Sequence, residues 1–303
     1  MTQYPFATVD VFTEQRFGGN TLAVFTDARG MSDADMQSLA AEMNLSETTF
    51  VLPPEDRAHA ARVRIFNRTA EMPFAGHPMV GTAYVLARQR GTTDEILWLE
   101  VLAGNVKVKL ERASDGTVIG ARIAAPQTLT IGESVPADVV ARCVGLEPRD
   151  IVTDTHQPCF GSVGVRHMIV EVAPDALGRA TPDFAAFRRG MQEHPTRDGR
   201  FSILIYAHAD SAGAPPETQR IRARMFAPIS GTVEDPATGS ACSTLGALLL
   251  SHSNHDRRAY EIVQGVEMGR PSALDVRAWR ADDGVHASVS GRCVDVLRGE
   301  ATA

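Results

Sequence analysis

Hydrophobic and polar residues alternate along many short segments of the chain, whereas two other segments are apolar at nearly every position. Alternation, which is typical of β-strands with one buried face, is clear at residues 8–12, 62–66 and 220–226. Further strand-like segments lie at residues 22–25, 48–52, 167–172 and 201–206. The two apolar segments, 78–86 and 241–250, lie shortly after a glycine. Because a helix that is apolar all round is buried all round, the pattern predicts bent sheets that enclose two buried helices.

Local capping signals predict two further helices. Ser32 and Asp35 form a capping-box pattern ahead of an amphipathic helix. Thr181-Pro182 is a good N-cap and first-turn pair for a helix in the second half. Near the C-terminus, two separate strands are expected at 286–289 and 293–297.

One strand–loop–helix pattern occurs twice. Residues 62–66 read Arg-Val-Arg-Ile-Phe, and residues 222–226 read Arg-Ala-Arg-Met-Phe. Each copy leads into Glu-x-Pro-x-(Ala/Thr)-Gly, which ends at Gly76 in the first copy and at Gly239 in the second. The copies are 160 positions apart at the strand and 163 apart at the glycine. Two matches at nearly one offset indicate an internal duplication.

The duplication predicts an α+β fold of two pseudo-symmetric domains, each a bent β-sheet or barrel wrapped around a central apolar helix. A chain of 303 residues is long enough for two cores. The boundary is expected near Pro126, giving domains at 1–125 and 126–303, with a return of the last strand to the first domain left open. Two facing halves would place two glycine-led helix N-termini beside one cleft, which suits a small molecule bearing a carboxylate.

Composition narrows the choice of partners. The formal charge of −7 and the pI near 5.7 provide no basic stripe, so nucleic acid is not an expected partner. With no secretory signal and no apolar stretch long enough to span a bilayer, we expect no membrane association and a cytoplasmic location. No Walker loop, dinucleotide-binding glycine motif or metal-ligand spacing is present, so no metal and no cofactor are expected. A homodimer is also expected.

Five residues of the repeated loops are candidates for the site. Gly76 and Gly239 precede helices, where free backbone N–H groups and the helix dipole favour an anion. His77, Asp235 and Ser240 would add polar side chains beside them. A structural reading stays open for each of these three, because His77 also fits a tight turn, Asp235 a capping carboxylate and Ser240 a first-turn residue.

Glu47 lies where a helix gives way to a strand, and it is the candidate acid/base. A glutamate at such a place is most often a solvated turn residue. The corresponding segment of the second half, around Ser202, has no carboxylate. If Glu47 does act as an acid/base, the chemistry would therefore use one base rather than a symmetric pair.

These residues lie in motifs that resemble the PhzF family of phenazine biosynthesis-like isomerases, which share the diaminopimelate epimerase fold. The resemblance covers essentially the whole chain. Its motifs are Gly19-Asn20 with Leu22–Phe25, Asn44–Val51, Glu71-x-Pro73-Phe74-Ala75-Gly76-His77-Pro78, Arg224–Pro228, Glu234–Ala241, Gln264-Gly265 and Met268–Ser272.

The resemblance implies a role for each candidate. Glu47 matches the proton-shuttling glutamate of the family, and His77 and Asp235 match residues that support it. Ser240 matches a further supporting polar residue, and the backbone donors are matched by Gly76 and Gly239. Ser46, next to Glu47, is expected to bind substrate as well.

Related amino-acid epimerases use two cysteines, one in each half, as a paired acid and base. The aligned residues in this chain are Ala75 and Thr238, and Cys242 lies too far along to replace either. A two-thiol racemase is therefore disfavoured.

Two departures from the family pattern bear on specificity. The family commonly has Asn-Pro where this chain has Asn20-Thr21, and Thr-Pro where this chain has Asn67-Arg68. Neither departure changes the expected catalytic set, but Arg68 would alter the substrate pocket or its preference for anions.

The sequence thus predicts a cofactor-independent isomerase that acts on a small carboxylic acid by glutamate-mediated proton transfer, as the family does on trans-2,3-dihydro-3-hydroxyanthranilate. Two alternatives stay open. Ser240, His77 and Asp235 could form a hydrolytic triad, although no Gly-x-Ser-x-Gly elbow is present. The chain could also be a non-catalytic protein that binds a metabolite.

Overall fold

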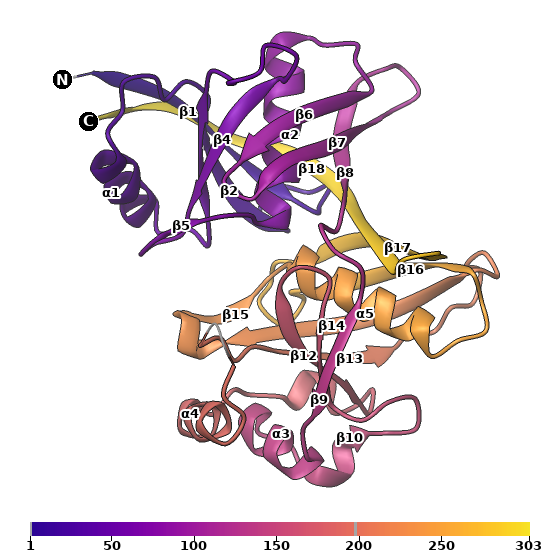
Figure 1. The fold of residues 1–303 in the computed structure, drawn as a ribbon. Coiled ribbons are helices and arrows are strands. Elements are labelled where there is room, and N and C mark those ends of the chain that lie inside the picture. The colour runs from indigo at the N-terminus through magenta and orange to yellow at the C-terminus, as the bar shows by residue number, and fades with distance from the viewer. Residues whose placement is uncertain (1, 197–198) are drawn as a thin grey trace. The chain divides into compact units, whose positions relative to one another are not determined.

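The computed structural model describes residues 2–196 and 199–303, which form 18 β-strands and five α-helices (Figure 1). The fold is therefore mixed α+β. Contacts divide the chain into two compact units. Unit 1 takes in the chain as far as Ala124 together with Ser290–Ala303, and unit 2 is Ala125–Val289.

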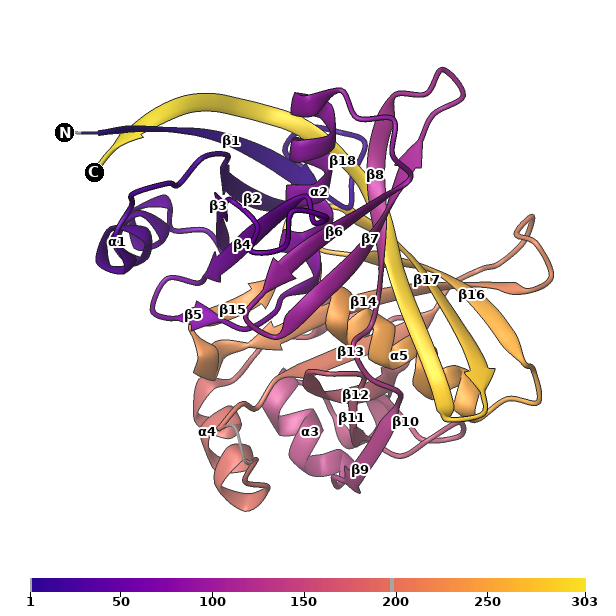
Figure 2. The same ribbon diagram turned by 45° about the horizontal axis from the view of Figure 1, so that its top comes forward.

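Unit 1 contains two helices and eight complete strands, as far as the structure describes it. The helices are α1 (Asp33–Met43) and α2 (Gly76–Arg90). The strands are β1 (Gln3–Val11), β2 (Asn20–Phe25), β3 (Thr48–Leu52), β4 (Ala61–Phe66), β5 (Glu71–Met72), β6 (Ile96–Val101), β7 (Gly104–Arg112) and β8 (Val118–Ala124). The last strand of the chain, β18 (Gly284–Thr302), begins in unit 2 and pairs with β1 in unit 1, so that the two chain ends lie side by side (Figures 1 and 2).

Unit 2 contains the other three helices and nine strands of the described chain. The helices are α3 (Ala137–Val144), α4 (Phe184–Glu193) and α5 (Gly239–Ser251). The strands are β9 (Thr130–Ser134), β10 (Ile151–Val152), β11 (Cys159–Ser162), β12 (Arg166–Val172), β13 (Ile203–His208), β14 (Thr218–Ala227), β15 (Thr232–Asp235), β16 (Arg257–Gln264) and β17 (Ser272–Ala281).

The same succession of strand pairings occurs in both units. In unit 1, β2 and β3 are parallel, β4 is antiparallel to β3 and β5, and β4 runs parallel to β6. In unit 2, β12 and β13 are parallel, β14 is antiparallel to β13 and β15, and β14 runs parallel to β16. The register also agrees, since Thr48 pairs with Phe66 as Ile203 pairs with Phe226. Position by position, β3 therefore corresponds to β13 and β4 to β14.

A nearly apolar helix is buried within each unit. Helix α2 packs against β1, β2, β3, β6, β7 and β8, and every residue from His77 to Ala87 is buried. Helix α5 packs against β11, β12, β16 and β17, and its residues from Ala241 to Leu250 are buried. The absence of an amphipathic stripe in both helices agrees with this burial.

The cores beside these helices follow the alternation of the strands. Phe25 stacks on Phe50 with ring centroids 4.8 Å apart, and Phe66 meets Phe50 edge-on at 5.5 Å. Together with α1 these rings form one core of unit 1. In unit 2 one core lies between the sheet and the helices α3 and α4.

Several local predictions are confirmed and two are wrong. Ser32 caps α1 by accepting a hydrogen bond from the Asp35 backbone at 3.1 Å, as the capping-box pattern predicts. Helix α4 begins later than Thr181-Pro182, because the Asp183 carboxylate takes the N-cap position by accepting from the Ala186 backbone at 2.8 Å. The two expected C-terminal strands are one continuous strand, β18.

Candidate active site

In unit 1 the structure brings Glu47 and His77 together. Glu47 immediately precedes β3, and His77 is the second residue of α2. The Glu47 Oε2 atom lies 3.5 Å from His77 Nδ1, with side-chain exposures of 17% and 6%. Ala75, in extended conformation, ends the preceding loop, so that α2 begins at Gly76. The largely buried carboxylate and imidazole lie within ion-pair distance of each other, and the helix N-terminus offers backbone donors beside them.

The segment that carries Glu47 is anchored to the start of β2. Ser46 Oγ donates a hydrogen bond to Asn20 Oδ1 at 3.1 Å. Asp10 holds the loop before Asn20, because its carboxylate accepts from the Thr21 hydroxyl and the Phe17 backbone, both at 2.7 Å. Thr21, which departs from the family pattern, therefore contributes to the support of this loop.

Arg68, the other departure, lies beside the same segment. Its Nη1 donates to the carbonyl of Leu45 at 3.4 Å, two residues before Glu47. The preceding Asn67 closes its own turn, since Asn67 Oδ1 accepts from the Thr69 and Ala70 backbone at 2.8 Å each. A guanidinium thus lies near the segment that carries the candidate acid/base.

In unit 2, Asp235 ends β15 and Thr238 is the N-cap residue of α5. The Thr238 hydroxyl donates to Asp235 Oδ2 at 2.5 Å. The Asp235 carboxylate is therefore fixed in the loop that leads to Gly239, the first residue of α5. This contact gives Asp235 a structural role in the loop, whatever further role it has.

Gln264 at the end of β16 organises this loop, a function that its place in the Gln264-Gly265 motif does not reveal. Its amide nitrogen donates to the Asp235 carbonyl at 2.7 Å, and its amide oxygen accepts from the Thr238 backbone at 3.2 Å. Gly265 follows with φ of +76°, and a Cβ there would lie 2.6 Å from the Pro236 carbonyl oxygen. Glycine is required at 265 because the backbone is left-handed and touches the loop.

Ser240, the second residue of α5, contacts a histidine that sequence reasoning missed. His167 Nε2 lies 3.0 Å from Ser240 Oγ, and His167 Nδ1 lies 3.0 Å from Ser202 Oγ. His167 and Ser202 are both buried. Because 73 positions separate His167 from Ser240, no local motif connects the two residues.

The repeated Arg and Glu residues form the same ion pair in each unit. Arg64 donates two hydrogen bonds to the Glu71 carboxylate, both at 2.7 Å. Arg224 donates two to Glu234, at 2.8 and 3.0 Å. Each guanidinium also lies over the phenylalanine two positions along its own strand. These bidentate pairs hold β5 and β15 in place before the loops that lead to α2 and α5.

The cysteines are poorly placed for thiol chemistry. Ala75 and Thr238 occupy the two N-cap positions, and Cys242 lies a full turn further along, fully buried in α5. The Cys242 thiol donates to Gln264 Oε1 at 3.4 Å. Burial raises the pKa of the Cys242 thiol well above its ordinary range, so that it is protonated at neutral pH.

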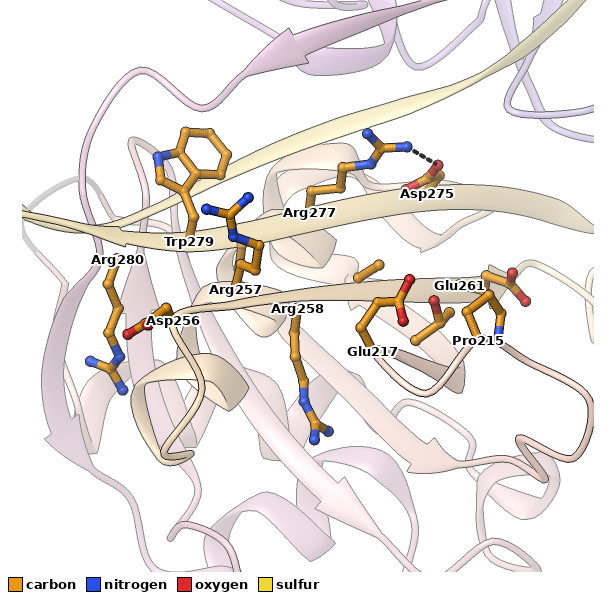
Figure 3. A pocket seen from close by; sticks show the side chains of 13 residues that line it. Pro215, Glu217, Asp256, Arg257, Arg258, Glu261, Asp275, Arg277, Trp279 and Arg280 are labelled. Carbon is orange, nitrogen blue, oxygen red and sulfur yellow. Dashed lines mark ion pairs between the residues drawn. The ribbon is translucent and has the colours of Figure 1, made fainter.

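A cavity of about 690 Å³ lies along β16 and β17 of unit 2, but none of the candidate residues lines it (Figure 3). Four arginines and four carboxylates surround it, and Arg277 pairs with Asp275 at 3.7 Å. The balanced charges give it no preference for an anion. A second cavity of about 730 Å³ in unit 1, beside Arg64 and Glu71, likewise includes none of the candidate residues.

Comparison with known proteins identifies the family. The sequence matches the model of the phenazine biosynthesis-like protein family over residues 9–299. The chain belongs to this family. A trans-2,3-dihydro-3-hydroxyanthranilate isomerase of Pseudomonas aeruginosa is 36% identical to it over 299 residues, which are 98% of each chain. With relatives of this kind, the chain is an isomerase of the PhzF type.

Solved structures extend the comparison to the fold. A PhzF-family phenazine biosynthesis protein of Bacillus anthracis superposes with a TM-score of 0.86 at 24% identity, covering all of both chains. A hydroxyproline epimerase of Agrobacterium vitis superposes with a TM-score of 0.61 at 13% identity, covering 98% of this chain and 92% of that one. The fold is thus shared with amino-acid epimerases. Within the described residues, no helix is long and apolar enough to cross a membrane.

Proposed function

We propose that this protein is a cofactor-independent isomerase that moves a proton between two carbons of a small carboxylic acid, with Glu47 as the acid/base. The observation that carries the proposal is the pair formed by Glu47 and His77 at the start of α2. The substrate class follows from the Pseudomonas aeruginosa relative, which is named for trans-2,3-dihydro-3-hydroxyanthranilate. The proposal includes the pseudo-symmetric, epimerase-like arrangement of two halves that the sequence predicts.

In the proposed reaction Glu47 takes a proton from an activated carbon of the substrate, the double bond shifts, and Glu47 returns the proton to another carbon. One C–H bond breaks and one forms, so that nothing is added or lost. Negative charge develops on the substrate in between, and preorganised donors stabilise such charge. His77, the backbone at Gly76 and Gly239, and the Ser240 hydroxyl are the donors that we assign to this task, with Ser46 and Asp235 as supporting groups.

The proposed reaction is tested with trans-2,3-dihydro-3-hydroxyanthranilate in deuterated water, followed by NMR. We expect an isomer in which the acceptor carbon carries either deuterium from solvent or the original hydrogen. The balance depends on how long the site excludes water. A product that has gained the elements of water would support the hydrolase alternative, and binding without any chemical change would support the metabolite-binding alternative.

The role of Glu47 is tested by Glu47→Gln, which keeps the shape of the side chain but cannot accept a proton. Turnover should fall by about 100- to 10,000-fold, the usual contribution of a general acid/base, while ligand binding and the unfolding midpoint stay close to wild type. The matched control is Glu42→Gln, which changes an exposed glutamate on α1 and should leave turnover unaltered. Near-normal turnover in Glu47→Gln would refute the assignment of Glu47 as the acid/base.

A further inference from the structure

His167 connects two hydroxyl groups of unit 2 through its two ring nitrogens. Nδ1 lies 3.0 Å from Ser202 Oγ, and Nε2 lies 3.0 Å from Ser240 Oγ. His167 is only 5% exposed and Ser202 only 7%, so solvent hardly competes for these bonds. The three residues come from β12, from the residue before β13 and from the first turn of α5. They therefore form a row of hydrogen-bonded polar groups that leads from buried Ser202 and His167 to half-buried Ser240 at the N-terminus of α5.

The duplicated topology shows which contact of unit 1 corresponds to the hydrogen bonds among Ser202, His167 and Ser240 in unit 2. In the parallel pair β2–β3, Ala23 lies opposite Thr48, which sets Glu47 one position before that pair. In β12–β13, Met168 lies opposite Ile203, which sets Ser202 at the position of Glu47. Unit 1 thus has a glutamate that reaches the second helix residue, His77, directly. Unit 2 has a shorter serine at that position, and His167 bridges the remaining distance to the second helix residue, Ser240.

The direction of the hydrogen bonds decides what Ser240 can offer a ligand. A hydroxyl group has one proton and two lone pairs, and a neutral imidazole has one N–H and one acceptor nitrogen. If Ser202 donates to Nδ1, then Nε2–H donates to Ser240 Oγ, and the Ser240 proton is available to an acceptor on a ligand. With the opposite tautomer, Ser240 donates to His167 and can only accept from a ligand. A carboxylate needs the first arrangement, because it only accepts hydrogen bonds.

We propose that His167 is a positioning residue: Ser202 fixes it as the Nε2–H tautomer, and it holds Ser240 as a hydrogen-bond donor to the carboxylate of the substrate. The inference rests on the proposed function for the identity of the acceptor. It assigns no proton transfer to His167. In this respect the second unit differs from the first, in which the corresponding position carries the acid/base Glu47.

The tautomer is measured without any substrate. Two-bond ¹⁵N–¹H NMR of the imidazole groups distinguishes the Nε2–H form from the Nδ1–H form, and loss of one signal set in His167→Gln assigns the resonances. We expect the Nε2–H form for His167 in the wild type and a mixture of the two forms in Ser202→Ala. The Nδ1–H form in the wild type would overturn the inference.

The effect on the ligand is measured with 3-hydroxyanthranilate, the aromatic analogue of the proposed substrate, which keeps its carboxylate but cannot undergo the reaction. Ser240→Ala should raise the dissociation constant about 10- to 100-fold, as loss of a hydrogen bond to a charged group does. His167→Asn, whose shorter side chain does not reach Ser240, should raise it about 5- to 20-fold. His167→Gln, which can place an amide N–H near the position of Nε2, should restore most of the affinity.

A double-mutant cycle separates positioning from simple structural support. If His167 acts through Ser240, adding His167→Asn to Ser240→Ala should change the dissociation constant less than 2-fold further. An equal loss in both backgrounds would overturn the inference. Labelling of wild-type Ser240 by a fluorophosphonate would also overturn it, because the serine would then be a nucleophile with His167 as its base.

The same measurements keep this inference apart from the proposed function. Glu47→Gln should bind the analogue normally and lose only turnover. Binding without turnover in the wild type would refute the isomerase proposal while the cycle still decides the role of His167. If the wild type turns over the substrate but the effects of His167→Asn and Ser240→Ala on the dissociation constant are additive, only the role of His167 is refuted.

Discussion

The residues at the two helix starts determine which chemistry is available. Where related epimerases have a cysteine in each half, this chain has Ala75 and Thr238 as N-cap residues. Alanine has no acid/base group, and the Thr238 hydroxyl is engaged with Asp235. In the proposed reaction the proton transfer is therefore assigned to another residue, Glu47, whose carboxylate lies beside His77 at the start of one of these helices.

It follows that the thiols should be dispensable. Burial raises the pKa of Cys143 to about 12 and that of Cys159 to about 11, and it also raises the pKa values of Cys242 and Cys293. Because only the thiolate reacts, iodoacetamide at pH 7.5 should modify the folded protein slowly, and the rate should increase as the pH approaches these values. Mass spectrometry of folded and urea-unfolded samples measures the difference, with four modifications expected after unfolding.

Activity provides the second measurement for the thiols. Cys242→Ser keeps a donor for Gln264 and should retain turnover within about 3-fold, because the change is nearly isosteric. Rapid inactivation by iodoacetamide that substrate prevents would contradict this expectation. It would instead support a racemase that uses cysteine thiols as acid and base.

How far the role of a single residue could be assigned from the sequence depended on whether a recognisable motif pointed to that role. Glu47 and His77 lie in motifs that can be recognised in one dimension, and the structure places them in contact. His167 lies in none of these motifs, and the motif that contains Gln264 does not reveal what its side chain does, because the partners of the two residues are 73 and 26 positions away in the sequence. A buried histidine in a strand has no local signature that distinguishes a positioning role from packing.

At the scale of elements, the repeated Arg and Glu residues explain why the strand–loop–helix repeat could be recognised in the sequence. Each pair joins a strand to the short strand that precedes the helix loop, so both ends of the motif are fixed by one interaction. Elements without such a repeated pair were harder to foresee. The start of α4 depended on which of several polar residues caps the helix, and the unbroken length of β18 depended on partners that are distant in the sequence.

The two ion pairs should differ in their contribution to stability. Arg224 is 6% exposed, and its Nη1 also donates to the carbonyls of Leu177 and Ala180. Glu234→Gln removes the carboxylate that this buried guanidinium contacts at 2.8 Å and leaves only Glu267, 4.0 Å away, so it should lower the free energy of unfolding by about 3–5 kcal/mol. Urea denaturation of the purified variant measures the loss.

Glu71→Gln is the matched control in the other unit. Arg64 has a side chain 18% exposed and also pairs with Asp33, so another carboxylate and solvent remain available to it. The loss should be smaller, about 1–2 kcal/mol. Equal losses in the two variants would show that burial does not set the strength of these pairs.

At the scale of the whole molecule, the chain order and the compact units do not coincide. Unit 1 closes only with Ser290–Ala303, the last residues of the chain. Strand β18 supplies them, and it pairs with β1 from Val11 opposite Cys293 to Gln3 opposite Thr302. It also pairs with β8. Unit 1 is therefore incomplete until the end of the chain has been synthesised, whereas unit 2 is contiguous in sequence.

Deletion of residues 290–303 should for this reason disrupt unit 1 rather than remove a tail. Without β18, the strands β1 and β8 both become edges, and buried Val9 and Val11 lose the neighbouring strand. Exposed edges with apolar residues favour aggregation and local unfolding. Limited proteolysis should then digest residues 2–124 while a fragment spanning 125–289 persists.

Deletion of 301–303, the control, removes only the pairs at the end of the strand and should leave the digestion pattern unchanged. Equal protection of both units in the long deletion would contradict the argument, because unit 1 would then be stable without the strand that closes it.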